Sequence, residues 1–298
     1  MRAEDSAQYS TNEPVGLLAG WGRYPIVVAE AMRRRGHRVV GLGVRDHADP
    51  ILAEVCDEFD WIGVGTVSGA IRRFRRAGVQ RAVMAGKIHK VMFYHPKWWL
   101  RHRPDWGAVR TFYRHFVTGA RDRKDDSLLS ALVGAYAAAG IRFEPATDFA
   151  PELLVQEGQV AGRGLSARQL LDVEFGWELA KQMGRLDIGQ TVCVKDQAIL
   201  AVEAIEGTDE CIRRAGELCR QGGFTVVKVA KPQQDMRFDV PTVGLNTLES
   251  IAAAGGRVLA IEAERTILLD AKLFHAAAQR LKLSVVALRH EAGAVRAA

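Results

Sequence analysis

The stretch KPQQDMRFDVPTVG, at positions 231–244, holds the residue types of this chain that are best suited to chemistry. It sets one Lys, one Arg, two Asp and two Gln between an apolar run and an expected helix start. Lys231 and Arg237 could neutralise phosphate oxygens, and Asp235 and Asp239 could hold Mg²⁺ or orient a water molecule. The alternative is a solvated turn with two surface ion pairs.

Two more polar segments stand at element junctions in the second half. Residues 184–190 (GRLDIGQ) follow a helix that we expect to stop at Gly184, and they carry more polar groups than a helix end needs. Residues 203–209 (EAIEGTD) join a strand to a helix that we expect Thr208 to cap. Such an acidic loop could bind a cation or hydroxyl groups, or could simply cap the helix. The polar residues concerned are Arg185, Asp187, Gln190, Glu203, Glu206 and Asp209.

In the first half, GWGRYP at positions 20–25 joins a strand to a helix. Backbone N–H groups at such a helix start favour phosphate. The stretch half-matches GxGxxG through Gly20 and Gly22, and Asp46 stands where a ribose-binding acid would. A tight turn without a ligand explains it equally well.

Two other pairs are weaker signals. Gly86 and Lys87 end a strand, where ligands sit in open α/β sheets, although an exposed loop lysine is the simpler interpretation. Asp125 and Asp126 start a helix, where acids either complement the helix dipole or bind a metal or ribose.

The elements that must position these residues alternate between short strands and helices. This pattern predicts an α/β protein with an N-terminal Rossmann-like parallel-sheet domain at residues 13–145 and a second α/β domain with a mixed sheet at 146–290. Residues 144–152 are the expected linker. The expected strands are 15–19, 39–44, 59–64, 82–85, 191–195, 198–205, 224–230, 258–261, 266–269 and 284–288, and the expected helices are 26–35, 67–77, 125–139, 167–183, 208–219, 247–254 and 271–281.

Bulk composition limits the possible classes. The chain has 298 residues, of which 48% are hydrophobic and 26% charged, as in soluble globular proteins. It contains no apolar run of bilayer length and no signal-peptide layout, so we expect a cytoplasmic protein. Its four cysteines lack CxxC spacing, which argues against a zinc site or a disulfide framework.

The net charge of +6 comes from one segment. Residues 87–124 hold ten Lys or Arg against two Asp, a balance of +8, so the rest of the chain carries −2. This argues against a nucleic-acid partner. Residues 89–121 also contain Trp98, Trp99 and Trp106, and they could lie at a membrane surface or form an aromatic hairpin packed on its own domain or at a dimer contact.

These motifs, in this order, resemble the LpxI family of UDP-2,3-diacylglucosamine pyrophosphatases. The resemblance spans roughly residues 14–290 and is strongest in GRLDIGQ (184–190), AVEAIEGTD (201–209) and KPQQDMRFDVPTVG (231–244). It is looser in LLAG (17–20), AG (85–86) and KDD (124–126). Trp21, in a turn where the family often has a third Gly, and the Trp-rich basic segment are departures from the family.

The resemblance implies a cytoplasmic, metal-dependent enzyme of lipid A synthesis. Such an enzyme hydrolyses UDP-2,3-diacylglucosamine to UMP and the diacylglucosamine 1-phosphate called lipid X, has its active site between two domains and tends to dimerise. Peripheral contact with the inner membrane is a further expectation. The family's essential aspartate, in its Arg-x-Asp-x-Pro-Thr pattern, corresponds to Asp239.

The resulting site hypothesis has three parts. The catalytic residues are Asp239, Arg237 and Lys231, and the metal, Mg²⁺ or Mn²⁺, has Asp125, Asp126, Glu203, Asp209 and Asp239 as its candidate ligands. The substrate-binding residues are Gly20, Gly22, Gly86, Lys87, Asp187, Gln190, Thr208, Gln234 and Thr242.

Two rival functions remain open at this point. The first strand, turn and helix together with Asp46 allow an NAD(P)-dependent oxidoreductase. A non-catalytic nucleotide-sugar or lipid-binding protein could also keep this fold.

Overall fold

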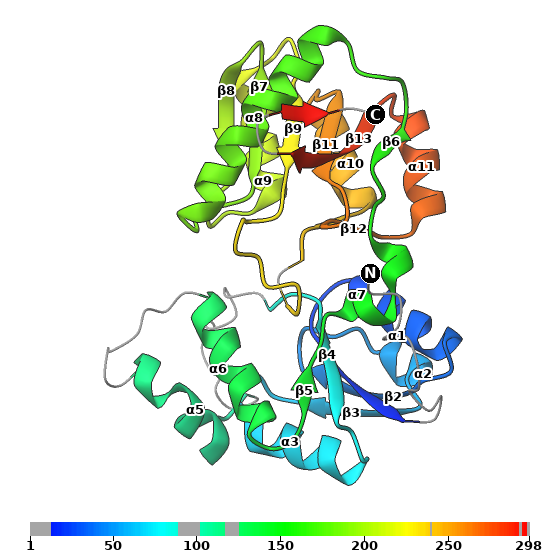
Figure 1. The fold of residues 1–298 in the computed structure, drawn as a ribbon, viewed down its shortest axis with the longest axis vertical. Helices are drawn as coiled ribbons and strands as arrows, with labels where there is room; N and C mark the ends of the chain where they lie inside the picture. The colour runs from blue at the N-terminus through cyan, green and yellow to red at the C-terminus, as the bar shows by residue number, and fades with distance from the viewer. Residues whose placement is uncertain (1–12, 89–101, 117–124, 239, 292–293, 297–298) are drawn as a thin grey trace. The chain divides into compact units, whose positions relative to one another are not determined.

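The computed structural model describes residues 13–88, 102–116, 125–238, 240–291 and 294–296, with only the backbone at 114–116, 125–126, 290–291 and 294–296. The chain divides into two compact units. The first comprises residues 1–151 together with Asp235–Phe238, and the second comprises Glu152–Gln234 and Asp239–Ala298. Figure 1 labels most of the helices and strands of each unit.

A wholly parallel sheet with the strand order β3-β2-β1-β4-β5 forms the centre of the first unit. The strand order reverses direction between β1 and β4, as in doubly wound α/β folds. The elements are β1 (Pro14–Ala19), α1 (Tyr24–Arg34), β2 (Arg38–Val44), α2 (Leu52–Val55), β3 (Glu58–Ile62), α3 (Val67–Arg76), β4 (Arg81–Ala85), α5 (Trp106–Phe116), α6 (Asp125–Ala137), β5 (Arg142–Phe143) and α7 (Ala146–Phe149).

Helices cover both faces of this sheet (Figure 1). On one face, Phe74 of α3 and Tyr136 of α6 are fully buried and pack with Leu42 of β2 and Met84 of β4. Helices α3 and α6 each carry a stripe of apolar side chains at helical spacing. Burial of that stripe against the strands holds each helix to the sheet.

One carboxylate caps two helices of the first unit. Asp105 Oδ2 accepts from the backbone N–H of Gly69 in α3 at 2.8 Å, and its Oδ1 accepts from Ala108 in α5 at 2.9 Å. Burial raises the pKa of Asp105, but the backbone N–H donors of both helices outweigh that effect and hold it below its usual value. Asp105 therefore joins the two helix starts electrostatically.

The second unit has a mixed sheet with the order β14-β13-β11-β9-β7-β8, and β6 pairs antiparallel with β13. Strands β9, β11 and β13 are parallel, whereas β7 is antiparallel to both β9 and β8. Following the 3-10 helix η2 (Pro151–Leu153), the elements are β6 (Gly158–Ala161), α8 (Ala167–Arg185), β7 (Thr191–Lys195), β8 (Ala198–Val202), α9 (Thr208–Leu218), β9 (Thr225–Lys228), β10 (Thr242–Val243), α10 (Leu245–Ala253), β11 (Val258–Glu262), β12 (Ile267–Leu268), α11 (Ala271–Arg280), β13 (Ser284–Glu291) and β14 (Ala294–Arg296).

Alternate side chains of this sheet enter two separate cores. Cys193 of β7 and Val226 of β9 pack with α9, α10 and α11, whereas their neighbours Val194 and Val227 pack with Trp177 of α8. The period of two along each strand requires this division. The expected fold class, a Rossmann-like parallel-sheet domain followed by an α/β domain with a mixed sheet, is confirmed.

The structure differs from the sequence expectations in local elements. Helices α2, α5 and α7 were not expected from the sequence pattern. Residues 146–151, within the expected linker, belong to the first unit, because α7 buries Phe149 beside His37 and Arg81. The guanidinium carbon of Arg81 lies 4.8 Å from the centre of the Phe149 ring. The first unit therefore extends past the expected boundary at 145.

Two helix-end predictions were wrong. Helix α8 continues to Arg185, and Gly184 lies inside it, where a Cβ would meet Lys231 Cα at 3.2 Å. Thr208 is the first residue of α9 and does not cap it, because its hydroxyl donates to Glu203 Oε1 at 3.0 Å. Both residues thus serve contacts outside their helices, which the usual helix-end signals do not record.

In the ranges that the structure describes, no helix is both long and apolar enough to cross a lipid bilayer.

We expect Asp105→Ala to lower the free energy of unfolding by about 1–2 kcal/mol at neutral pH, since helix starts lose that much without their cap. Because the folded-state pKa is depressed, this stabilisation is complete above the unfolded-state pKa of about 4 and disappears as the pH falls through the folded-state value. Urea unfolding across acidic and neutral pH measures the effect. Glu54→Ala, at an exposed acid of α2, is the control; a pH-independent Asp105 effect would contradict the interpretation.

Candidate functional site

Two loops of the first unit meet at the carboxyl edge of its sheet, where β1 and β4 end side by side. The backbone N–H of Gly20 donates to the carbonyl oxygen of Ala85 at 2.8 Å, and Trp21 and Lys87 exchange two backbone hydrogen bonds at 2.8 and 3.0 Å. Gly86 has φ +91°, and a Cβ there would lie 2.7 Å from the carbonyl carbon of Gly20. The structure thus brings Gly20, Gly86 and Lys87 together at the point where the strand order reverses.

The other first-unit predictions have different surroundings. Gly22 adopts φ +106° with open space at its Cβ position, and the Lys87 side chain is exposed. Asp46 lies after β2, and its Oδ2 is 3.3 Å from Nε2 of the buried His102. Because His102 Nδ1 accepts from the backbone N–H of Val64 at 3.2 Å, Nε2 carries the proton that faces Asp46. Asp46 thus has a structural partner here.

One edge of the second sheet gathers the predicted residues of that unit. The pairings Thr191↔Lys228 and Ile261↔Lys228 place the start of β7 beside the ends of β9 and β11. The pairing Val192↔Val202 adds the end of β8. The segments that hold Asp187, Gln190, Glu203, Thr208, Lys231 and Gln234 therefore leave or enter the sheet at this edge.

Lys231 is bound to Asp187 at this edge. Lys231 Nζ donates to Asp187 Oδ1 at 2.6 Å, and both side chains are mostly buried. Asp187 adopts φ +57°, a left-handed conformation that turns the chain from α8 towards β7. The Gln234 side chain accepts from the backbone N–H of Lys231 at 3.0 Å. The predicted cation is thus held beside an acid 44 residues away in the chain.

Glu203 lies buried at the same edge, in contact with threonine. Its Oε1 accepts from the hydroxyl of Thr208, which lies 3.4 Å from the hydroxyl of Thr191. Its Oε2 is buried and has no hydrogen-bond partner among the described residues. An unsatisfied buried carboxylate oxygen is costly, so this atom is ready to accept a proton donor or a cation.

Three other predicted residues have different surroundings. Thr242 donates to the carbonyl oxygen of Val240 at 3.1 Å, and its own carbonyl accepts from the buried Lys228 at 3.1 Å. The Gln190 side-chain oxygen is buried without a partner in the described ranges. Asp209 accepts from Ser250 of α10 at 3.0 Å, so this acid ties two helices together.

Arg237 is grouped with the first unit and is paired with Asp235. Its Nε donates to Asp235 Oδ1 at 2.9 Å, and a second guanidinium nitrogen donates to Oδ2 at 2.6 Å. These bonds from Arg237 hold the pKa of Asp235 below its usual value. The next residue, Phe238, packs against the core that contains Phe74. Asp239 lies outside the described residues.

A buried ion pair that the sequence interpretation missed fixes the chain just before Lys231. Lys181 Nζ of α8 donates to both carboxylate oxygens of Glu262 at 2.8 and 2.7 Å, and also to the carbonyl oxygen of Ala230 at 2.9 Å. Glu262 Oε2 in turn accepts from the backbone N–H of Ala230 at 2.7 Å. We call these three residues the Ala230 clamp.

A sequence signal for the clamp existed. Trp177, Lys181 and Gly184 follow helical spacing on a buried stripe of α8, and Glu262 ends the apolar strand VLAIE. A charge on a buried stripe requires a partner. Burial lowers the pKa of Lys181, although contact with Glu262 opposes that effect.

The predicted metal ligands whose side chains are described do not come together as a metal site. Among the residues with described side chains, no group of three His, Cys, Asp or Glu lies close enough to hold a metal ion. Glu203 and Asp209 have the separate contacts given above. The side chains of Asp125 and Asp126, which begin α6, and that of Asp239 lie outside the description.

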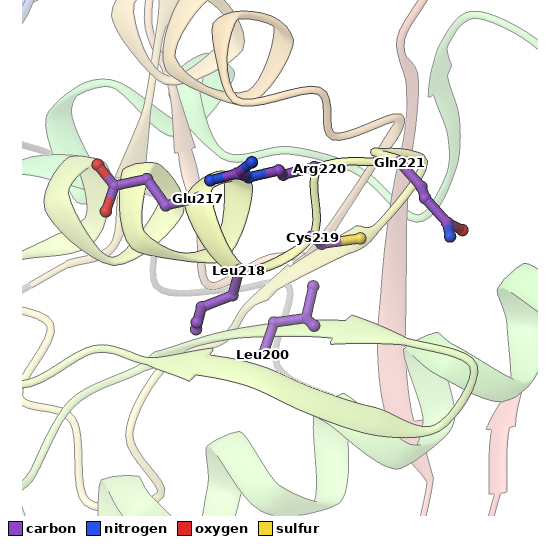
Figure 2. Close-up of a pocket in the computed structure, with 6 residues that line it drawn as sticks. All are labelled: Leu200, Glu217, Leu218, Cys219, Arg220 and Gln221. Carbon is purple, nitrogen blue, oxygen red and sulfur yellow. The ribbon is translucent and has the colours of Figure 1, made fainter.

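A shallow hollow of about 390 Å³ lies elsewhere on the second unit (Figure 2). It is lined by Leu200 of β8 and by residues 217–221, at the carboxyl end of α9. Thr208, at the sheet edge, begins the same helix at its opposite end. None of the predicted site residues lines this hollow.

Both units thus present polar groups at an edge where strand ends meet, the usual place for a phosphate-bearing ligand in α/β folds.

The model of the LpxI N-terminal domain matches residues 14–153, and that of the LpxI C-terminal domain matches residues 156–286.

The chain belongs to the LpxI family.

A relative from Caulobacter vibrioides, named UDP-2,3-diacylglucosamine pyrophosphatase LpxI, is 29% identical over 287 residues. The match covers 91% of this chain and 96% of that relative. The family expected from the GRLDIGQ, AVEAIEGTD and KPQQDMRFDVPTVG motifs is confirmed.

We expect Lys181→Met to destabilise the protein by about 3–5 kcal/mol, because it leaves the carboxylate of Glu262 buried without a cation. The double variant Lys181→Met/Glu262→Gln should recover part of this loss, since a neutral amide can still bind both backbone groups of Ala230. Chemical unfolding of the single and double variants measures the coupling.

The exposed pair Arg280–Glu249 is the matched control, and Arg280→Met should cost less than about 1 kcal/mol. If the clamp variants were no less stable than this control, or their effects were simply additive, the clamp would not hold Ala230 as described.

Proposed function

We propose that this protein hydrolyses the pyrophosphate bond of UDP-2,3-diacylglucosamine to release UMP and lipid X. The observation that carries the proposal is membership of the LpxI family over both domains, together with a relative named for this substrate. The gathering of Asp187, Glu203, Thr208 and Lys231 at one sheet edge supports it, since these motif residues lie where a phosphate ligand would bind.

The proposed roles follow from side-chain chemistry. Lys231 and Arg237 offset the negative charge of the pyrophosphate, which otherwise repels a nucleophile. The partners that they have in the structure, Asp187 and Asp235, orient them. Asp239 positions and deprotonates the attacking water.

The nucleotide-sugar also needs contacts that hold it in place. We assign these to Gly20, Gly22, Gly86, Lys87, Asp187, Gln190, Thr208, Gln234 and Thr242. Backbone N–H groups at the start of α1 suit a phosphate, whereas hydroxyl and amide groups suit a sugar or a base.

The proposal includes a divalent cation, Mg²⁺ or Mn²⁺, which when bound would supply charge neutralisation at the phosphates. Its candidate ligands are Asp125, Asp126, Glu203, Asp209 and Asp239; of these, Glu203 has a buried oxygen that no described residue satisfies. We place the enzyme in the cytoplasm, as a homodimer with peripheral contact to the inner membrane.

We expect Asp239→Asn to lower kcat at least a hundredfold with little change in KM, because an acid that acts in the transition state contributes chiefly to kcat. UMP release from UDP-2,3-diacylglucosamine measures both constants. Asp196→Asn, at the exposed hairpin acid that pairs with Arg168, is the matched control. A folded Asp239→Asn protein with near-normal kcat would remove Asp239 from catalysis.

We expect chelation with EDTA to abolish UMP release, and added Mg²⁺ or Mn²⁺ to restore it. Substrate binding, measured separately by calorimetry on the chelated protein, should weaken less than turnover. Full turnover after exhaustive chelation would show that Lys231 and Arg237 neutralise the pyrophosphate without a metal.

A further inference from the structure

The exposed face of α5 is apolar. Trp106, Val109 and Tyr113 are 80%, 41% and 50% exposed. Their spacing of three and four residues puts them within an arc of about 60° on a helix with 3.6 residues per turn. Ala108, on the other side of α5, is buried, and Phe112 packs against the core of the first unit. The helix thus has an inner face held by the fold and an outer apolar stripe.

Basic residues surround this stripe. Arg103 and Arg110 are exposed beside it, and α3 presents the exposed residues Arg72, Arg75 and Arg76. In residues 67–76 and 102–113 the sole acid is Asp105, whose carboxylate accepts backbone N–H groups. The two helices and the turn before α5 therefore expose an excess of basic residues.

The two helices form one continuous piece of surface. Gly107 of α5 lies so close to Ser68 of α3 that a Cβ at Gly107 would meet Ser68 Oγ at 2.1 Å. The carboxylate of Asp105 binds the starts of both helices. Figure 1 shows α5 and α3 at the outside of the first unit. The apolar stripe and the arginines consequently keep a fixed relation to each other.

We propose that the outer faces of α5 and α3 form a docking surface for an anionic phospholipid leaflet. Trp and Tyr side chains are enriched where an apolar layer meets water, and arginines are attracted to anionic headgroups. A second copy of the chain fits less well, because a two-fold contact would bring two sets of arginines face to face.

The docking surface deepens the proposed function and rests on it. A substrate with two acyl chains resides in a membrane, so an enzyme seated on the leaflet meets it without extracting it into water. The residues on which the proposed surface rests are all described. Trp98 and Trp99, which also favoured a membrane contact in the sequence analysis, lie outside the described residues.

Co-sedimentation of the full chain with phosphatidylcholine vesicles, with and without phosphatidylglycerol, tests the surface directly. We expect binding to the anionic vesicles only, weakening as salt is added. Trp106→Ser/Tyr113→Ser should reduce binding roughly tenfold, and Arg72→Gln/Arg75→Gln/Arg76→Gln on the order of a hundredfold. Since these side chains are exposed, thermal unfolding should change little, with a small decrease for the arginine variant because Arg75 and Arg76 lie in the last turn of α3.

Two variants of the second unit are matched controls. Leu273→Ala removes another exposed apolar side chain, and Arg163→Gln/Arg220→Gln/Lys272→Gln removes three other exposed basic groups. Neither control should change vesicle binding. Absence of binding by the wild type, or equal binding by all variants, would overturn the proposal. So would a dimer in sedimentation velocity that the Trp106→Ser/Tyr113→Ser variant dissociates, since that outcome makes the stripe a self-association surface.

The vesicle test uses no substrate, so its result is independent of hydrolysis. A second assay then compares UMP release from vesicle-embedded and detergent-dispersed substrate. The docking variants should lose activity only with vesicles. If the docking variants lost the vesicle binding that the wild type shows, but the wild type never released UMP, the docking surface would be retained and the proposed function would be refuted.

Discussion

The Ala230 clamp is the interaction on which the arrangement of the second unit's polar edge depends. Lys181 and Glu262 come from α8 and β11, and both hydrogen-bonding groups of the Ala230 backbone are satisfied between them. Burying two charges is expensive, and the pair is favourable only because its geometry is good and its remaining hydrogen bonds are made. The position of Lys231, one residue later, follows from that constraint.

In the first unit, glycines in tight turns allow the loops at the sheet edge to approach each other. There the loops after β1 and β4 approach through backbone hydrogen bonds, and the absence of a side chain at Gly86 permits the contact. The two units thus use different means to bring chain segments together at a sheet edge: an ion pair fixes one loop, and close backbone approach fixes the others. In both units the polar side chains are attached to a backbone that the core already holds.

Local pattern was sufficient to predict the alternation of elements. Apolar stripes such as that of α3 and short buried strands such as β4 identified the fold class, because period and turn residues are local properties. The family motifs directed attention to Asp187, Glu203 and Lys231. Long-range contacts could not be predicted from the sequence. The ion pair between Lys181 and Glu262 joins residues 81 positions apart, and no local rule pairs them.

Contacts outside the helices explain the wrong helix ends. Gly184 resembles a helix terminator, yet α8 continues because Lys231 and Pro232 pack against that glycine. Thr208 resembles a cap, yet its hydroxyl is used by Glu203, and Gly207 takes the cap position. In each case a contact outside the helix outweighed a preference of the order of 1 kcal/mol.

The shared carboxylate of Asp105 also has a consequence for motion. Local opening of a helix start normally exposes only that helix's own N–H groups to solvent. Here one side chain satisfies groups of both α3 and α5, so release of Asp105 from either helix weakens the start of the other. The amide hydrogens of Gly69 and Ala108 consequently belong to one cooperative opening unit, and their exchange with solvent is coupled although they lie 39 positions apart in the chain.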